Sequence, residues 1–462
     1  MNGTTKTKLP PLPFEVMNAA TSKQDTAPAP LDATFPIAVG LVVLMIAGVL
    51  AFGAVYPSGI ALLQIGSAAL FIAMLLVMAF RSKSLRLQAK AAYAPMLFVG
   101  ALILFQLASG HTAYWYVSYQ EALLDFSYLL AFVIASEAFR TARAARFAIT
   151  ALALVGPAIS IFAILESFTR NGKLYWLLAP ETPGYLMMFG QYVSRNHYAG
   201  MIELLAPFSV FAALQPRTPT ERRVLHLFAA AIMYASVGIA ASRAGVIVCA
   251  IELLLIAALY FRRSRGNTLT LSLVACLAVC ALPLLWLEPQ VLLDRFRDLP
   301  TEITFGRGAF YRDALHMIFV HPWTGFGLHT FATVYPHYRS FYTDYVVNEL
   351  HNDWLQAFVE LGIIGGLAIC IAAFFILRDA LRLVLSRGHA TSQLSAFRTA
   401  SLVGLIGLML HGLVDFNMHV PANAFAFFIL CAWATNRSAP LSHERPRKSH
   451  LMDRDRVQDA GR

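Results

Sequence analysis

Residues 304–366 read TFGRGAFYRDALHMIFVHPWTGFGLHTFATVYPHYRSFYTDYVVNELHNDWLQAFVELGIIGG. This is a long polar and aromatic-rich stretch in a chain made largely of apolar runs, and it leads through His351 directly into one of those runs. Polar and aromatic residues at the end of an apolar run are typical of the boundary between water and lipid. We therefore expect the chemistry of the protein in this stretch.

The composition sets the class of the protein. Of its 462 residues, 58% are hydrophobic and only 13% are charged, so most of the apolar surface must meet lipid. The cysteines lie in apolar runs without a CxxC pattern, which predicts core side chains rather than disulfides or thiolate metal sites. We expect an integral membrane protein that needs no metal and no other cofactor.

Hydrophobic runs of about the length that crosses a bilayer, roughly 17–25 residues, predict an all-α polytopic fold with about 12 transmembrane helices. The predicted spans cover residues 35–55, 59–80, 92–109, 122–139, 147–168, 196–214, 224–241, 245–261, 268–287, 354–377, 399–414 and 418–435. Residues 1–34 lack a hydrophobic period, which predicts a disordered tail and no cleaved signal peptide. Residues 288–353 form one large loop between spans, and residues 436–462 form a basic tail.

The distribution of positive charge orients these spans. With a cytoplasmic N-terminus, roughly three quarters of the 36 Lys and Arg residues fall in cytoplasmic segments, as the positive-inside rule requires. Both termini are then cytoplasmic, and the 288–353 loop faces the opposite side. The net charge of +10 sits in loops beside anionic lipid, so we expect membrane lipids and no nucleic acid as partners.

Arginines make up nearly all of the positive residues on the outer side. Arg243 lies in ASRAGV between two closely spaced spans, while Arg307 and Arg312 open a run with apolar residues at helical spacing that His321 and Pro322 end. The guanidinium group binds phosphate oxygens in pairs and keeps its charge. These arginines are therefore candidates for a phosphate site, although snorkelling and ordinary surface arginines are the alternative.

His351 is the candidate base. Asp353 and Gln356 match a capping box, so a membrane helix should begin at about Asp353 with His351 one turn outside it. Imidazole is the side chain best suited to proton transfer near neutral pH. A surface histidine without a catalytic role remains the alternative.

Several acidic residues lie within or beside the predicted spans. Glu203 and Glu360 each lie about two turns into a span, where a carboxyl group is functional or paired. His411 and Asp415 are expected to form a polar pair near the outer end of span 399–414.

The runs GRGAFYRDALHMIFVHPWTGFGLHTFATVYPHY and ELHNDWLQAFVELGIIGG resemble the signature region of the O-antigen ligase and polysaccharide polymerase family of bacterial envelope glycosyltransferases. SRNHYAGMIELLAP, ASRAGV and HGLVDFNMHVPANA resemble its flanking motifs, so the resemblance spans about residues 190–430. One departure is Tyr311, at a position where the family pattern favours tryptophan.

The resemblance implies a GT-C-like fold and a metal-independent, inverting transfer of a glycan from undecaprenyl pyrophosphate to an acceptor hydroxyl, on lipid A core or another glycan, at the periplasmic face of the bacterial inner membrane. His351 matches the family's loop histidine, which we expect to be catalytic, and Arg243, Arg307 and Arg312 match its pyrophosphate-contacting arginines. We expect support for this site from Arg195, Asn196, Glu360 and Asp415.

The chemistry agrees with this assignment. A polyprenyl pyrophosphate is a good leaving group, so the enzyme has to stabilise its charge and deprotonate the attacking hydroxyl. We expect a ligase, with an O-antigen or exopolysaccharide polymerase as the alternative, because both share these motifs. A transporter of lipid-linked glycan should show repeated halves, which the sequence lacks; a non-catalytic scaffold would leave His351 replaceable.

Overall fold

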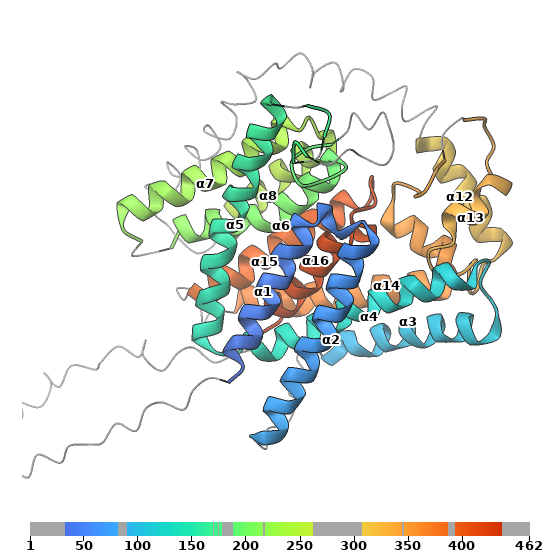
Figure 1. Ribbon diagram of the computed structural model, residues 1–462, viewed down its shortest axis with the longest axis horizontal. Helices are drawn as coiled ribbons and strands as arrows, with labels where there is room; N and C mark the ends of the chain where they lie inside the picture. Colours follow the sequence, from blue (N-terminus) through green and yellow to red (C-terminus); the bar gives the residue numbers. More distant parts are fainter. Residues whose placement is uncertain are drawn as a thin grey trace, which may run out of the picture. The chain divides into compact units, whose positions relative to one another are not determined.

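The computed structural model describes residues 33–81, 90–169, 171–173, 175–177, 188–215, 218–261, 307–343, 346–386 and 393–436. Within these ranges the chain is helical, and the only β-pairing is an isolated bridge between Phe189 and Tyr192. The predicted all-α class is therefore confirmed. Figure 1 shows the helices along the chain.

The long helices coincide with eleven of the twelve predicted spans, and the remaining one, 268–287, lies outside the described residues. Six described helices are long and apolar enough to cross a membrane, and three more are apolar but shorter. The chain is thus a polytopic membrane protein, while the count of twelve stays a prediction. The helices are α1 (Phe35–Leu50), α2 (Pro57–Phe80), α3 (Lys90–Ser109), α4 (Trp115–Ala138), α5 (Ala142–Phe168), α6 (Arg195–Ala213), α7 (Thr220–Ile239), α8 (Arg243–Phe261), α12 (Gly308–Val320), α13 (Phe331–Val334), α14 (Asp353–Leu385), α15 (Gln393–His411) and α16 (Pro421–Ala434).

Helices α6 and α16 form the interior of the bundle. Nearly every residue of each is buried, as expected for helices that are apolar on all sides. α6 packs on α7 and α15, and α16 packs on α4 and α15. A helix surrounded by protein can be shorter than one that faces lipid along its length, which is consistent with the 14 residues of α16.

Segments that the charge distribution assigned to one side of the membrane meet in the structure. At one end, the start of α6 contacts the connection between α15 and α16 through Asn196 and Asp415. At the other end, the Asn436 side chain donates to the Phe139 carbonyl at 3.2 Å, joining the ends of α16 and α4. These contacts agree with the predicted order of the spans.

The amphipathic helix predicted after Arg307 is present as α12, which ends where His321 leaves the helix. Its buried face includes Ala314 and Met317, which join Phe331 and Tyr335 in a small core. α12 also packs on α14, so the described part of residues 307–352 has its own core against a membrane helix; we call this segment the outer loop after its predicted side.

α14 is broken near its start, where the loop 322–327 docks against it. Gly362 adopts φ 68°, and the broken turn exchanges hydrogen bonds with the loop: Ile363 N–H donates to the Pro322 carbonyl at 2.7 Å, and Gly327 N–H to the Glu360 carbonyl at 2.9 Å. A Cβ at Gly362 would lie 2.3 Å from the Trp323 carbonyl oxygen. The sequence predicted a continuous span 354–377; it is longer and kinked because the loop backbone replaces part of the helical bonding.

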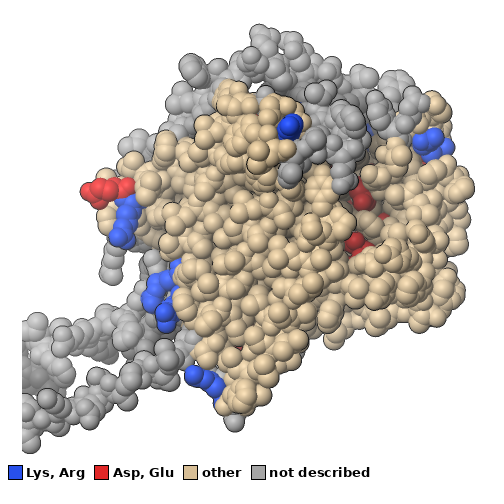
Figure 2. Space-filling view, viewed as in Figure 1, with Lys and Arg blue, Asp and Glu red and all other residues tan. Residues whose placement is uncertain are grey.

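Charged groups are unevenly placed on the face shown in Figure 2. This face is mostly uncharged, with basic groups near its edges and acidic atoms inside a hollow between the helices labelled α16 and α12 in Figure 1. Apart from an acidic group at the left edge, the acidic atoms visible on this face thus lie in its recess.

Candidate functional site

His351 is paired with a buried acid. Its Nδ1 lies 3.1 Å from Asp415 Oδ1, and 36% of the His351 side chain is exposed against 2% of that of Asp415. The carboxylate accepts the Nδ1 hydrogen, which leaves the lone pair on Nε2. His351 therefore has the tautomer and the exposure that a general base requires.

Asp415 continues this pair into a chain of hydrogen bonds. Its Oδ2 accepts a hydrogen bond from Asn196 Nδ2 at 2.5 Å, and Asn196 Oδ1 accepts one from the Ser242 hydroxyl at 2.9 Å. We call these four residues the His351 network: His351, Asp415, Asn196 and Ser242. It joins the segment before α14, the α15–α16 connection and the starts of α6 and α8.

The surroundings keep Asp415 ionised. Burial acts to raise the pKa of this carboxyl group, but the hydrogen bond with His351 and the nearby His197 ring outweigh it and hold the pKa well below its ordinary range. A carboxylate that stays charged can fix the orientation of an imidazole and stabilise its protonated form. Asp415 is therefore suited to position His351.

The backbone of His351 is held in an uncommon conformation. Its φ of 56° lies in the left-handed region, and the Tyr311 hydroxyl donates to its carbonyl oxygen at 3.0 Å. Burial raises the pKa of Tyr311 and the charge of Arg307 opposes this rise, so Arg307 lies close enough to act on the phenol. α12 thus contributes directly to the placement of His351, through a residue that departs from the family pattern.

The predicted arginines occupy different settings. Arg195 and Arg243 are the first residues of α6 and α8, each directly adjacent to a member of the His351 network. Arg307 lies at the start of α12 near Tyr311. Arg312 instead donates to the Ser340 hydroxyl at 3.3 Å within the outer loop.

The start of α14 is at Asp353, as predicted, but the capping residue is different. Asn352 is the N-cap, and its side-chain oxygen accepts a hydrogen bond from Leu355 N–H at 2.9 Å. Asp353 is turned toward the α15–α16 connection, where it accepts from Met418 N–H and contacts His419 Nδ1 at 2.9 Å. The predicted helix start was therefore correct, but Asp353 and Gln356 do not form the capping box that predicted it.

Glu360 lies outside the His351 network. Its carboxylate accepts from His329 N–H at 2.7 Å and from the Gln356 amide at 2.9 Å, so it holds the outer loop onto α14. Gln356 Nε2 also donates to Glu349 at 2.5 Å and lies 3.2 Å from His419 Nε2. Glu360 thus belongs to the surroundings of a second group of histidines and acids.

This second group, which we call the His419 cluster, consists of His329, Glu349 and His419. All three residues lie in the quoted motifs, but nothing in their spacing along the sequence shows that they meet. The pKa of His419 lies well above its ordinary value, because Glu349 and Asp353 raise it more than burial lowers it.

His411 does not pair with Asp415 as predicted. Its Nδ1 lies 2.8 Å from Glu203 Oε1, and both side chains are fully buried. His411 is the last residue of α15, whereas Asp415 follows four residues later, beyond the turn. The expectation that Glu203 is paired is confirmed, with His411 as its partner.

A cavity of about 740 Å³ lies beside the His419 cluster, between α3, α4, α14 and α16, and His329 and His419 form part of its wall. Its walls are mostly apolar, and its polar lining consists largely of acidic residues and histidines: Glu121, Asp125, His329, Asp353, Glu360 and His419. Such a cavity offers an apolar chamber next to ionisable groups.

Residues 196–370 match the family model described as O-antigen ligase. The match begins at Asn196, includes Arg243, Arg307 and His351, and ends within α14, before Asp415 and His419. No curated protein matches the chain. The matched region contains His351 and its network partner Asn196. Residues 196–370 of this polytopic membrane protein are therefore similar to the O-antigen ligase family.

Proposed function

We propose that the protein is a ligase-type glycosyltransferase that moves a glycan from undecaprenyl pyrophosphate to an acceptor hydroxyl. The observation that carries this proposal is the bond between the exposed imidazole of His351 and the buried carboxylate of Asp415. It supports proton abstraction at a surface that a sugar hydroxyl can reach.

In the proposed step, His351 Nε2 takes the proton of the acceptor hydroxyl. The hydroxyl oxygen then bonds to the anomeric carbon of the donor from the face opposite the leaving group, and the bond from this carbon to the pyrophosphate oxygen breaks. The products are the glycosylated acceptor with inverted configuration and undecaprenyl pyrophosphate. The proton passes from His351 to water, while Asp415 stabilises the imidazolium in between.

The departing pyrophosphate needs positive charge that is already in place. Arg243 directly follows Ser242 of the His351 network, and Arg307 lies near Tyr311, whose hydroxyl contacts His351. We assign the pyrophosphate contacts to these two arginines. These guanidinium groups take the role that a metal ion has in many phosphate-transfer sites, so the transfer itself is metal-independent.

The apolar cavity supports a lipid-linked donor, because its volume and lining suit part of a polyprenyl chain. We place the His351 network at the periplasmic face of the bacterial inner membrane, with both termini cytoplasmic. The distribution of Lys and Arg and the meeting of the predicted outer segments at one end support this orientation.

The test is a transfer assay with purified protein and an undecaprenyl-pyrophosphate-linked glycan. His351→Ala should lower turnover by roughly 10²- to 10⁴-fold, the usual contribution of a general base. His351→Asn is the more stringent variant, since asparagine tolerates the left-handed backbone of this position but cannot act as a base. The control is His321→Ala, since His321 packs on Phe326 at the end of α12.

Near-normal turnover by a folded His351→Asn protein would remove His351 from the proposed mechanism. Two acceptors in the same assay separate the ligase from its alternative: lipid A core should be glycosylated by a ligase, and a second lipid-linked glycan should be extended by a polymerase.

A further inference from the structure

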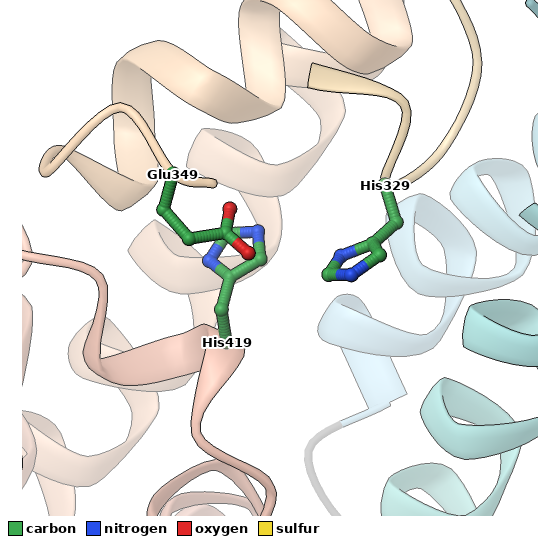
Figure 3. A group of neighbouring side chains, drawn as sticks. All are labelled: His329, Glu349 and His419. Carbon is green, nitrogen blue, oxygen red and sulfur yellow. The ribbon is translucent and has the colours of Figure 1, made fainter. Parts of the chain in front are cut away.

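The His419 cluster brings two imidazoles and a carboxylate from three separate segments to one place. One ligand atom each of His329, Glu349 and His419 lies within 4.8 Å of the other two, and all three side chains are partly buried. Figure 3 shows the Glu349 carboxylate beside the His419 ring, with His329 facing them from another segment. We propose that this cluster binds one divalent transition-metal ion, with zinc as the preferred metal.

His419 is oriented as a metal-bound histidine is. Its Nδ1 lies 2.9 Å from Asp353 Oδ1, which leaves Nε2 as the nitrogen that can bind an ion. Histidine ligands in metal sites nearly always donate their second N–H to a carboxylate or carbonyl, which fixes the tautomer. Asp353 therefore supplies the outer partner that a metal-binding His419 needs.

The side-chain amide of Gln356 has fewer hydrogens than there are possible acceptors around it. Its amide nitrogen carries two hydrogens but lies within 3.2 Å of three acceptors, on Glu349, Glu360 and His419. Exchanging the amide oxygen and nitrogen of Gln356 would not help, because the oxygen accepts a hydrogen bond from Leu350 N–H at 2.9 Å. When His419 Nε2 carries no hydrogen, at least one acceptor is left over, and a proton or a metal ion satisfies it.

His329 has a ring nitrogen, Nδ1, that makes no hydrogen bond among the described residues. This nitrogen is buried, and Glu121 Oε2 lies 3.8 Å away. The backbone of His329 has φ 57° and is held there by its N–H bond to Glu360 at 2.7 Å. The side chain is thus presented to the cluster by a strained backbone.

Acidic side chains gather beside the cluster. The described lining of the cavity contains four acidic side chains and two histidines, with no lysine or arginine among them. Carboxylates in such apolar surroundings require protons or a cation to offset their charge. A bound dication at the cluster offsets the charge of Glu349 and of the acids near it.

The donor set selects the kind of metal. Two imidazoles and one carboxylate form the protein ligands of several open zinc sites, whereas Mg²⁺ and Ca²⁺ prefer oxygen ligands alone. Zinc bonds to such ligands are about 2.0–2.2 Å long, so the three side chains have to draw together by about 1 Å on binding. This inference departs from the expectation that the protein binds no metal, although the ion lies outside the His351 network.

The ion would join the segments that carry the His351 network. Glu349 precedes His351 by two residues, and His419 follows Asp415 by four. Its role is therefore to hold these two segments together, and the transfer chemistry is not routed through it.

The experiment uses the full chain in detergent, purified with a tag that contains no histidine and then treated with a chelator. Titration with Zn²⁺ should give about one bound ion per chain by elemental analysis, and Co²⁺ should give the visible absorption of a four- or five-coordinate site. Zn²⁺ should also raise the midpoint of thermal unfolding, since a ligand that binds only the folded state stabilises it. Mg²⁺ at the same concentration should do neither.

The variants locate the site. His419→Gln and Glu349→Gln should each weaken Zn²⁺ binding at least tenfold, and Asp353→Asn by about 10- to 100-fold, as expected for an outer partner. His337→Gln is the matched control, an exposed histidine of the same loop, and should bind as the wild type does. Absence of stoichiometric Zn²⁺ binding by the wild type, or unchanged binding by His419→Gln, would overturn the proposal.

Discussion

The His351 network and the His419 cluster use the same kinds of side chain for different purposes. In the first, one imidazole faces one buried carboxylate whose other oxygen is already satisfied by Asn196. In the second, acceptors outnumber the hydrogens available to them. A balanced pair with an exposed nitrogen can pass a proton, whereas an excess of lone pairs attracts a cation. The number of hydrogen-bond partners therefore separates the two sites more clearly than residue type does.

The largest expected effect separates the two histidines directly. In the transfer assay, His351→Asn should lower turnover by roughly 10²- to 10⁴-fold, because the other base of the network, Asp415, is buried away from the substrate. His419→Gln should lower it less than about tenfold, because it acts only through the position of neighbouring segments. Equal losses from the two variants would mean that the two groups form a single catalytic site.

The arginines provide the next test. Arg243→Ala and Arg307→Ala should each lower turnover by about 10²- to 10³-fold, the effect of removing one preorganised contact to developing charge. Lysine at either position should restore only part of the activity, since an ammonium group cannot make the paired contact.

Arg312 is the control for these variants, because its guanidinium donates to Ser340 within the outer loop. Arg312→Ala should therefore cost less than either of the other two. Full activity of Arg243→Lys and Arg307→Lys would show that these residues supply only diffuse positive charge.

Local patterns predicted the parts of this site that lie close together in sequence. Helical spacing indicated α12, and the capping-box pattern of Asp353 and Gln356 placed the start of α14 correctly at Asp353, although Asn352 is the capping residue. The arginines and His351 were found because they are polar residues at the ends of spans. Asp415 was also found, but its partner was not, since the choice between His351 and His411 depends on how α15 ends.

The rest depends on contacts between distant segments. The break in α14 arises because a loop backbone bonds to the helix, and Gly362 alone does not reveal this. Glu360 was expected in the His351 network because it lies in the same motif, but it lies two turns further along α14 and faces the outer loop. The His419 cluster combines residues from three segments, none of which has a metal-binding spacing of its own.

A smaller effect is expected from the residue that orients the base. Asp415→Asn keeps the shape of the side chain but loses its charge, so the imidazole is held less firmly and its protonated form is less stable. Turnover should fall by roughly 10- to 100-fold with little change in the KM for the donor, because the residue acts through His351 rather than on the substrate. Asp415→Glu should recover part of the loss, which a purely structural role of the side chain would not produce.

The smallest effect is a change of stability with pH that belongs to the His351 network. The pKa of Asp415 in the folded protein lies below the ordinary carboxyl value of about 3.9, so folding favours its ionised form. Its contribution to the free energy of unfolding is complete above that ordinary value and is lost as the pH falls below it. The difference in stability between the wild type and Asp415→Asn should therefore stay constant from about pH 8 to pH 5 and shrink only below about pH 4. Unfolding midpoints in detergent, measured for both proteins across this range, test the sign. A difference in stability that already shrinks between pH 7 and pH 5 would mean that the histidine neighbours do not hold Asp415 ionised. His351 and Asp415 would then not form a balanced pair, and the contrast with the acceptor-rich His419 cluster would not hold.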